Sequence, residues 1–156
     1  MGLVASTFHF PVAPRGIPLQ TTDPGRYVDV DASSLRVAFD APRSGRVMVS
    51  IQAPGGSGFS TSVGYWALRG TGGEGPDNVV PGSERFIYGP AGLKQWQDGY
   101  QVILDVEPGR RYEWTFAFKP GDRHGTIVKI GHPEDDPTGH GPVLIEVWDT
   151  GTRGRR

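Results

Sequence analysis

The sequence predicts an all-β fold, an antiparallel β-sandwich or jelly roll with an extended N-terminal arm. Its 156 residues include 24 Gly and 14 Pro, which in a helix interior cost about 1 and about 3 kcal/mol each. Because they are spread along the chain, a helix bundle is excluded. The 4 Trp, 5 Tyr and 7 Phe exclude a disordered chain. Short alternating runs between turn signals are typical of a sandwich.

The first elements predicted with strong alternation form a hairpin over residues 34–53. Residues 35–39 and 47–51 place an apolar side chain at every second position, so one face of each run is expected in the core. Between them lies PRSG at 42–45, with Pro and Gly where a type I turn favours them.

A second hairpin is predicted from residues 100–106 and 112–118, joined by EPGR at 107–110, a Pro-Gly pair suited to a type II turn. Its second strand carries four aromatic residues on one face, each able to bury about 150–250 Å². We therefore expect this strand to be central in its sheet. The four residues are Tyr112, Trp114, Phe116 and Phe118.

The remaining elements follow from shorter runs. Residues 91–98 are the one helical candidate. Further strands are expected at residues 27–31, 61–69, 84–89, 124–131 and 141–149.

Residues 70–75 read GTGGEG, which matches the G-x-G-x-x-G pattern after a predicted strand. A dinucleotide site requires the third Gly to begin a helix that holds the pyrophosphate. PDNVVPG follows at residues 76–82 instead. The sequence therefore predicts a long flexible loop over 70–82 and no nucleotide site.

The chain divides into an extended Pro-rich arm at residues 1–25, a sandwich domain at 26–150 and a basic tail at 151–156. The arm's prolines favour polyproline geometry and exclude it from the interior of a sheet. We expect such an arm to bind neighbouring subunits by adding backbone hydrogen bonds to a sheet edge. Its candidate partner-binding residues are Phe8, Phe10, Pro11, Pro14, Ile17 and Pro18.

Charge and composition limit the partners. The net charge is −1, so no overall field favours nucleic acid or an acidic membrane. The chain has no Cys, which excludes disulfides and zinc–thiolate sites. No apolar run is long enough to span a membrane, and no signal peptide is expected at the N-terminus.

No catalytic residue, cofactor or metal is predicted. Residues 132–140, HPEDDPTGH, combine two His with three carboxylates, but the spacing matches no EF-hand loop. A solvated acidic loop is expected there, and whether it holds a cation is left open. Ser57 lacks the G-x-S-x-G elbow of a nucleophile. We therefore predict that the protein is not an enzyme.

Aromatic residues outside the 112–118 strand have two interpretations. Trp66, Trp96 and Trp148 are either core residues or part of a sugar-binding platform or subunit interface. The candidate ligand platform is Tyr65, Trp66 and Trp96.

Three blocks carry a resemblance to a known family. They are LRVAFDAPRSGRVMV at 35–49, EPGRRYEWTF at 107–116 and GPVLIEVW at 141–148. Over residues 27–150 the chain resembles small β-sandwich modules in virion proteins of actinobacterial tailed phages. The resemblance implies a jelly roll similar to the tumour-necrosis-factor and complement head domains, which are commonly trimeric.

The expected function is that of a structural protein of a phage virion, displayed as a capsid decoration, head fibre or tail appendage and anchored by its arm. The expected partners are two further copies of the chain and other virion proteins. The alternative is a carbohydrate-binding module that attaches the particle to a host-surface glycan.

Overall fold

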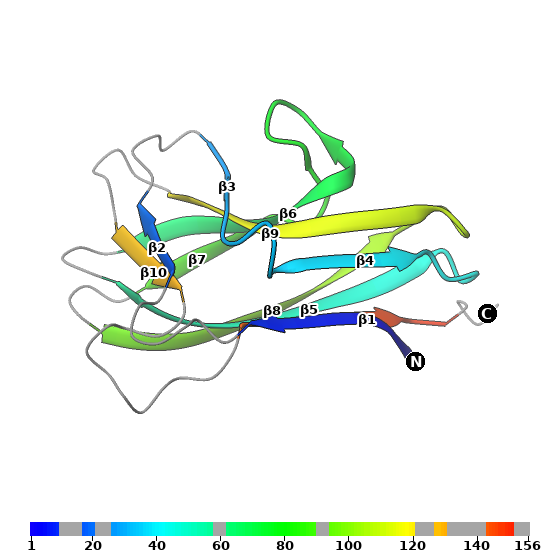
Figure 1. Ribbon diagram of the computed structural model, residues 1–156, viewed down its shortest axis with the longest axis horizontal. Coiled ribbons are helices and arrows are strands. Elements are labelled where there is room, and N and C mark those ends of the chain that lie inside the picture. The colour runs from blue at the N-terminus through cyan, green and yellow to red at the C-terminus, as the bar shows by residue number, and fades with distance from the viewer. Residues whose placement is uncertain are drawn as a thin grey trace.

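Two antiparallel sheets lie face to face as the layers of a β-sandwich (Figure 1). The computed structural model describes residues 1–9, 17–20, 26–57, 62–89, 94–120, 127–130 and 143–151. No helix occurs within these ranges, and so none there is long and apolar enough to cross a membrane. The predicted all-β sandwich is confirmed.

Sheet A has the strand order β1-β11-β5-β10-β2, and β8 pairs with the opposite edge of β5. Sheet B has the order β3-β9-β6-β7, and β4 also pairs with β9. The strands are β1 (Gly2–His9), β2 (Ile17–Gln20), β3 (Val28–Asp29), β4 (Arg36–Asp40), β5 (Arg46–Ser57), β6 (Ser62–Glu74), β7 (Arg85–Gly89), β8 (Lys94–Asp105), β9 (Arg111–Pro120), β10 (Ile127–Ile130) and β11 (Val143–Asp149).

The core lies between the sheets, and the aromatic side chains of β9 fill much of it. The inward face of this strand buries the four predicted aromatic residues, and β9 lies between β4 and β6. Its central position is therefore confirmed. Opposite it, β5 buries Val47, Val49 and Ile51. In both strands the side chains between these positions point away from the core, as the period of two requires.

Neither predicted hairpin forms, because both turns cross from one sheet to the other. β4 pairs with β9 in sheet B, whereas β5 pairs with β8 and β11 in sheet A. The connection at 107–110 likewise joins β8 of sheet A to β9 of sheet B. A turn signature predicts a chain reversal but does not say whether the reversal stays within one sheet.

The two crossings lie side by side and stabilise each other through backbone hydrogen bonds. Ala41 N donates to Arg110 O and Gly109 N donates to Ala41 O, both at 2.9 Å. Val106 N donates to Gly45 O, also at 2.9 Å. These bonds satisfy backbone groups that a hairpin would have paired within one sheet.

Two local predictions are also wrong. The segment predicted as a helix at 91–98 enters β8 at Lys94 and pairs with β5. The predicted loop at 70–82 begins as the end of β6, which continues to Glu74 before a turn at residues 75–78. Val79 then bridges back to β6. No helix follows these glycines within residues 76–89.

The predicted arm contains two strands that pair within the same chain. β1 pairs with β11, placing Phe8 opposite Leu144. β2 ends sheet A beside β10, placing Ile17 and Pro18 opposite Ile130 and Lys129. Both strands terminate the order of sheet A, which suits a Pro-containing segment. Residues 2–9 and 17–20 are thus extended as predicted, but they belong to the sandwich. Phe10, Pro11 and Pro14 lie outside the described residues.

Gly70→Ala tests the close approach of β6 to β9. Gly70 has φ of +136°, and a Cβ there would lie 2.0 Å from the Glu113 carbonyl oxygen. We expect the free energy of unfolding in urea to fall by at least about 3 kcal/mol. Gly75→Ala is the matched control, since φ is +69° but no atom lies within 4 Å, so only about 1–2 kcal/mol is expected. Equal losses of unfolding free energy in the two variants would contradict the close approach of β6 to β9.

Candidate functional site

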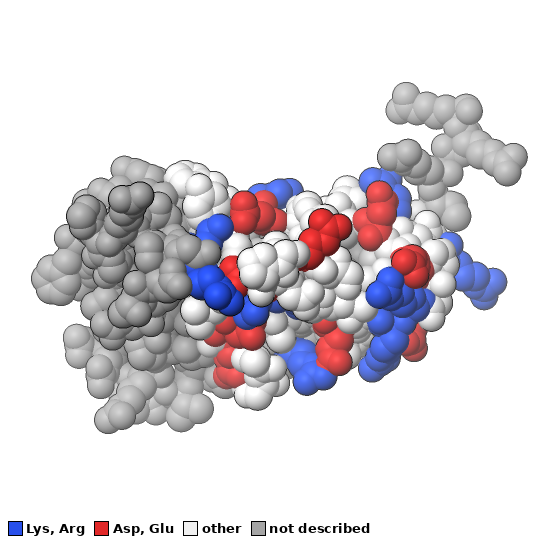
Figure 2. All heavy atoms as spheres, turned by 90° about the horizontal axis from the view of Figure 1, so that it is seen from above, with Lys and Arg blue, Asp and Glu red and all other residues white. Residues whose placement is uncertain are grey.

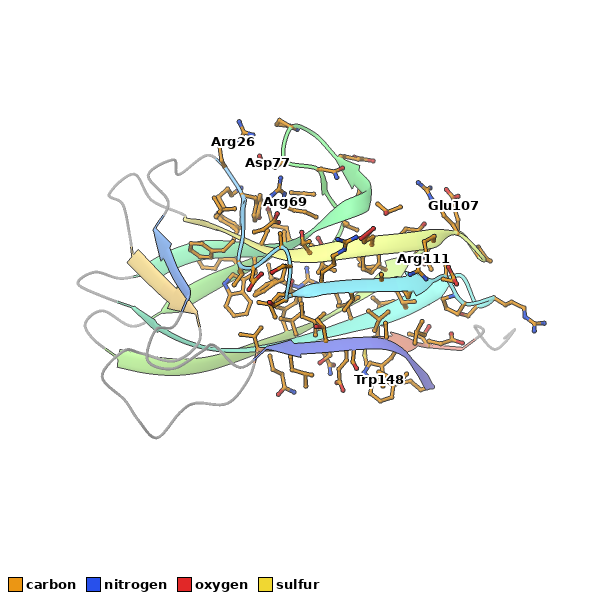
Figure 3. The ribbon with its side chains drawn as sticks, in the orientation of Figure 1. Arg26, Arg69, Asp77, Glu107, Arg111 and Trp148 are labelled. Carbon is orange, nitrogen blue, oxygen red and sulfur yellow. The ribbon has the colours of Figure 1, made fainter. Side chains whose placement is uncertain are left out.

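A row of apolar side chains crosses the outward face of sheet A. Leu3 on β1 pairs with Trp148 on β11, Trp148 pairs with Met48 on β5, and Met48 pairs with Ile103 on β8. Directly paired residues of antiparallel strands point to the same face. Leu3 is 52% exposed and Ile103 57% exposed. Trp148 points away from the sandwich in Figure 3. We call these four residues the apolar row.

Polar groups border the apolar row on both sides. On one side, Arg46 Nε lies 3.1 Å from Asp105 Oδ1. On the other side lie Ser6, Glu146, Ser50 and Gln101, which are paired with one another across the same strands. The Trp148 indole NH donates to Glu146 Oε2 at 3.4 Å. An apolar band bordered by polar rows resembles the core and rim of a protein interface.

The apolar surface continues around the edge of sheet A beside Ile103. Within the described residues β8 pairs with β5 alone, and a groove of about 790 Å³ opens between this edge and the turn after β6. Ile103, Val80, Pro81 and Tyr112 are among the residues that line it. One end of the apolar row therefore lies on the edge strand β1, and the other borders a groove.

A second, polar surface lies on the outward face of sheet B. Figure 2 views the molecule from this side and shows Lys and Arg interspersed with Asp and Glu. A groove of about 640 Å³ lies here, which we call the polar groove. The charged and hydroxyl groups that line it include Asp29, Arg36, Arg69, Arg110, Glu113 and Thr115.

Mutual contacts hold the side chains of the polar groove in place. Arg69 Nη1 lies 3.1 Å from Asp29 Oδ1, and Thr115 Oγ1 donates to the same oxygen at 2.8 Å. Arg69 Nε also donates to the Asp77 carbonyl oxygen at 2.6 Å. Arg36 pairs with Glu113. The guanidinium groups of Arg36 and Arg69 therefore each face a carboxylate, which fixes their orientation.

Asp77 fixes one wall of this groove by holding the start of β3. It is 8% exposed and lies beside Arg26 and Arg69 in Figure 3. Its Oδ1 accepts from Arg26 Nε at 2.8 Å and its Oδ2 from the Tyr27 amide at 3.1 Å. Burial opposes ionisation, but the Tyr27 amide and the Arg26 guanidinium outweigh it and hold the pKa of Asp77 below its ordinary value.

The structure places Trp66 of the predicted aromatic platform in the core. Trp66 is 0% exposed and packs edge-on against Phe116 with ring centroids 4.9 Å apart, so it cannot stack on a ligand. Tyr65 is half-buried, and its ring centroid lies 5.5 Å from that of Phe86. Trp96 lies on β8, and its side chain is outside the described part.

Phe86 is an exposed aromatic residue that sequence reasoning did not single out. Phe86 is 58% exposed on β7. The run RFIYG at 85–89 predicted a strand, but it did not indicate which of its aromatic residues would face outward.

The segment 132–140 lies outside the described residues. Within the described part, no three His, Asp or Glu side chains gather as a metal site would require.

The comparisons with known proteins support the fold alone. No protein-family model matches the sequence, and no curated protein matches it. Among solved structures, the chain is similar to the structure of Eiger TNF from S. frugiperda, with a TM-score of 0.54 and 13% sequence identity. The match covers 99% of this chain and 97% of that one. The predicted tumour-necrosis-factor-like jelly roll is thereby confirmed.

Asp77→Asn should lower stability in a pH-dependent manner. Because the folded pKa of Asp77 is depressed, its stabilisation is fully present above the unfolded pKa of about 3.9 and is lost as the pH falls through the folded pKa. In urea at pH 7 we expect the free energy of unfolding of Asp77→Asn to be about 1–3 kcal/mol lower than that of the wild type. This difference should become smaller below about pH 4.

Asp105→Asn is the matched control for Asp77→Asn. Asp105 is an exposed carboxylate in a surface ion pair with Arg46, so its replacement should change the free energy of unfolding by less than about 1 kcal/mol. If Asp77→Asn lowers the free energy of unfolding by the same amount at pH 3 and pH 7, the ionised Asp77 carboxylate does not provide the stabilisation.

Proposed function

We propose that the chain is a non-enzymatic structural protein of a phage virion, a jelly-roll module that acts as a homotrimer. The apolar row is the observation that carries the proposal. It includes a Trp and a Met, residues enriched in interfaces, and it extends across four adjacent strands of one rigid sheet. Burying it removes apolar surface from water at about 25 cal/mol per Å².

A second copy of the chain is the partner that fits this surface. The end of the apolar row at Leu3, on β1, and the groove beside Ile103 lie at opposite edges of sheet A. When two different patches of one molecule pair with each other, the contact is head-to-tail and a closed ring satisfies every patch. The family resemblance implies that this ring has three members, and the jelly-roll fold is consistent with it.

The virion setting rests on the three sequence blocks that resemble phage modules. Of the predicted partner-binding residues, Phe8, Ile17 and Pro18 lie on strands that pair within the chain. Phe10, Pro11 and Pro14 are the remaining candidates for contacts with other virion proteins. The alternative, adhesion to a host-surface glycan, loses Trp66 as a stacking residue and therefore needs a different binding surface.

Ile103→Asp should break the trimer without unfolding the chain. A carboxylate buried in an apolar contact without a partner costs about 3–5 kcal/mol, while Ile103 in a single chain is exposed. By light scattering, the wild type should have three times the chain mass of 16.9 kDa, and the variant should have the mass of one chain. Gln101→Asp, two residues away on the same outward face of β8, should stay trimeric.

The controls for Ile103→Asp separate association from folding. Circular dichroism should be the same for the wild type and both variants. A monomeric wild type, or an Ile103→Asp variant with the wild-type mass, would contradict the proposed interface.

The virion role has its own test. Particles of the encoding phage, purified by density gradient, should contain the chain by mass spectrometry, and antibodies against the sandwich should label intact particles. A chain found only in the soluble lysate, and absent from particles, would rule out the virion role.

A further inference from the structure

We propose that the polar groove of sheet B binds a saccharide. The groove is open to solvent and has a volume of about 640 Å³, within the range of about 300–1,000 Å³ that is usual for small-molecule sites. Strands β3, β4, β6 and β9 supply most of its walls. A rigid sheet holds such groups more firmly than loops do.

The lining of the polar groove selects a ligand rich in both donors and acceptors. Among the described residues that line it, none is aromatic, and Ala32 is the one apolar side chain. A nucleobase would find no ring on which to stack, and an apolar peptide side chain would find no pocket. Carboxylate, guanidinium, amide and hydroxyl groups alternate here instead, and vicinal sugar hydroxyls can donate to one and accept from its neighbour.

The ion pairs of the groove argue against an anion as the ligand. Arg69 already contacts Asp29 and the Asp77 carbonyl oxygen. Arg36 pairs with Glu113, and Arg110 Nη1 lies 2.9 Å from Glu107 Oε1. A phosphate or sulfate would have to compete with these partners for every guanidinium. A neutral saccharide can use the donors and lone pairs that each ion pair leaves free.

The contacts that orient the groove also reduce the cost of binding. Asp29 accepts from both Arg69 and Thr115, and the Thr71 hydroxyl oxygen accepts from the Glu113 amide at 3.2 Å. Side chains already fixed in the free protein lose little conformational entropy when a ligand arrives. Single sugars on an open polar site nevertheless bind weakly, so display of several copies would raise the overall affinity.

The test is an NMR titration of the ¹⁵N-labelled full chain with methyl glycosides. Glucose, galactose, mannose, rhamnose and N-acetylglucosamine glycosides are each added to about 50 mM, because sites of this kind bind in the millimolar range. At least one should shift the Arg69 Nε–H signal and the Gly70 and Gly72 amides saturably. Sodium sulfate at equal ionic strength to a sodium chloride control should not shift them saturably.

Paired variants locate the binding. Arg36→Ala should weaken the affinity at least about tenfold by removing charge-assisted hydrogen bonds. Arg111→Ala, which breaks the surface pair with Asp40 on the same sheet, should leave it within about twofold. Asn78→Gly is a second groove variant, and its φ of +54° favours Gly, so it should also weaken binding while the chain stays folded.

Three results would overturn the proposal. They are the absence of saturable shifts with every glycoside, equal affinities in Arg36→Ala, Asn78→Gly and Arg111→Ala, and saturable shifts with sulfate that exceed those with any glycoside. Thr71, Gly72 and Arg110 line both the polar groove and the groove beside Ile103, so light scattering of the same samples reports association separately from saccharide binding.

Discussion

The inward aromatic face of β9 is the constraint on which the rest of the molecule depends. Phe116 packs edge-on against Trp66 of β6 at 4.9 Å, and Trp114 packs against Phe39 of β4 at 5.0 Å. These contacts fix both neighbours of β9 with their apolar faces inward. Since a strand alternates strictly, the same constraint turns Glu113 and Thr115 outward. The polar groove is therefore positioned by the packing on the other side of the strand.

The sequence predicted the strands and their buried faces well but misplaced the connections. Alternation and turn residues are local signals, and they located β4, β5, β9 and the second half of β8 correctly. Pairing is not local, because β4 finds its partner more than seventy residues away in β9. The crossing at 42–45 is stable because the crossing at 107–110 lies beside it and supplies its hydrogen bonds. The sequence of either turn alone therefore does not show that the chain crosses to the other sheet.

The candidate surfaces were harder to predict, for the same reason. Leu3, Met48, Ile103 and Trp148 are each an ordinary apolar residue on the outward side of a strand. The pairing registers of three strand pairs align them into one row. The sequence leaves Trp66 with two interpretations because the run Tyr65-Trp66-Ala67-Leu68 is apolar on both faces, and the structure confirms the core interpretation. The outward side of this run is covered by Tyr27, which packs on Ala67 and Ala117.

The two surfaces lie on opposite layers of the sandwich, and this separation has a functional consequence. An assembly built on the outward face of sheet A covers the apolar row and leaves most of the outward face of sheet B uncovered (Figures 1 and 2). Thr71, Gly72 and Arg110 line both the polar groove and the groove beside Ile103, so a closed ring brings each polar groove to the border of a subunit contact. Linked sites convert a weak single contact into stronger overall binding when the ligand repeats at a matching distance. A repeating glycan surface meets that requirement, whereas a free monosaccharide does not.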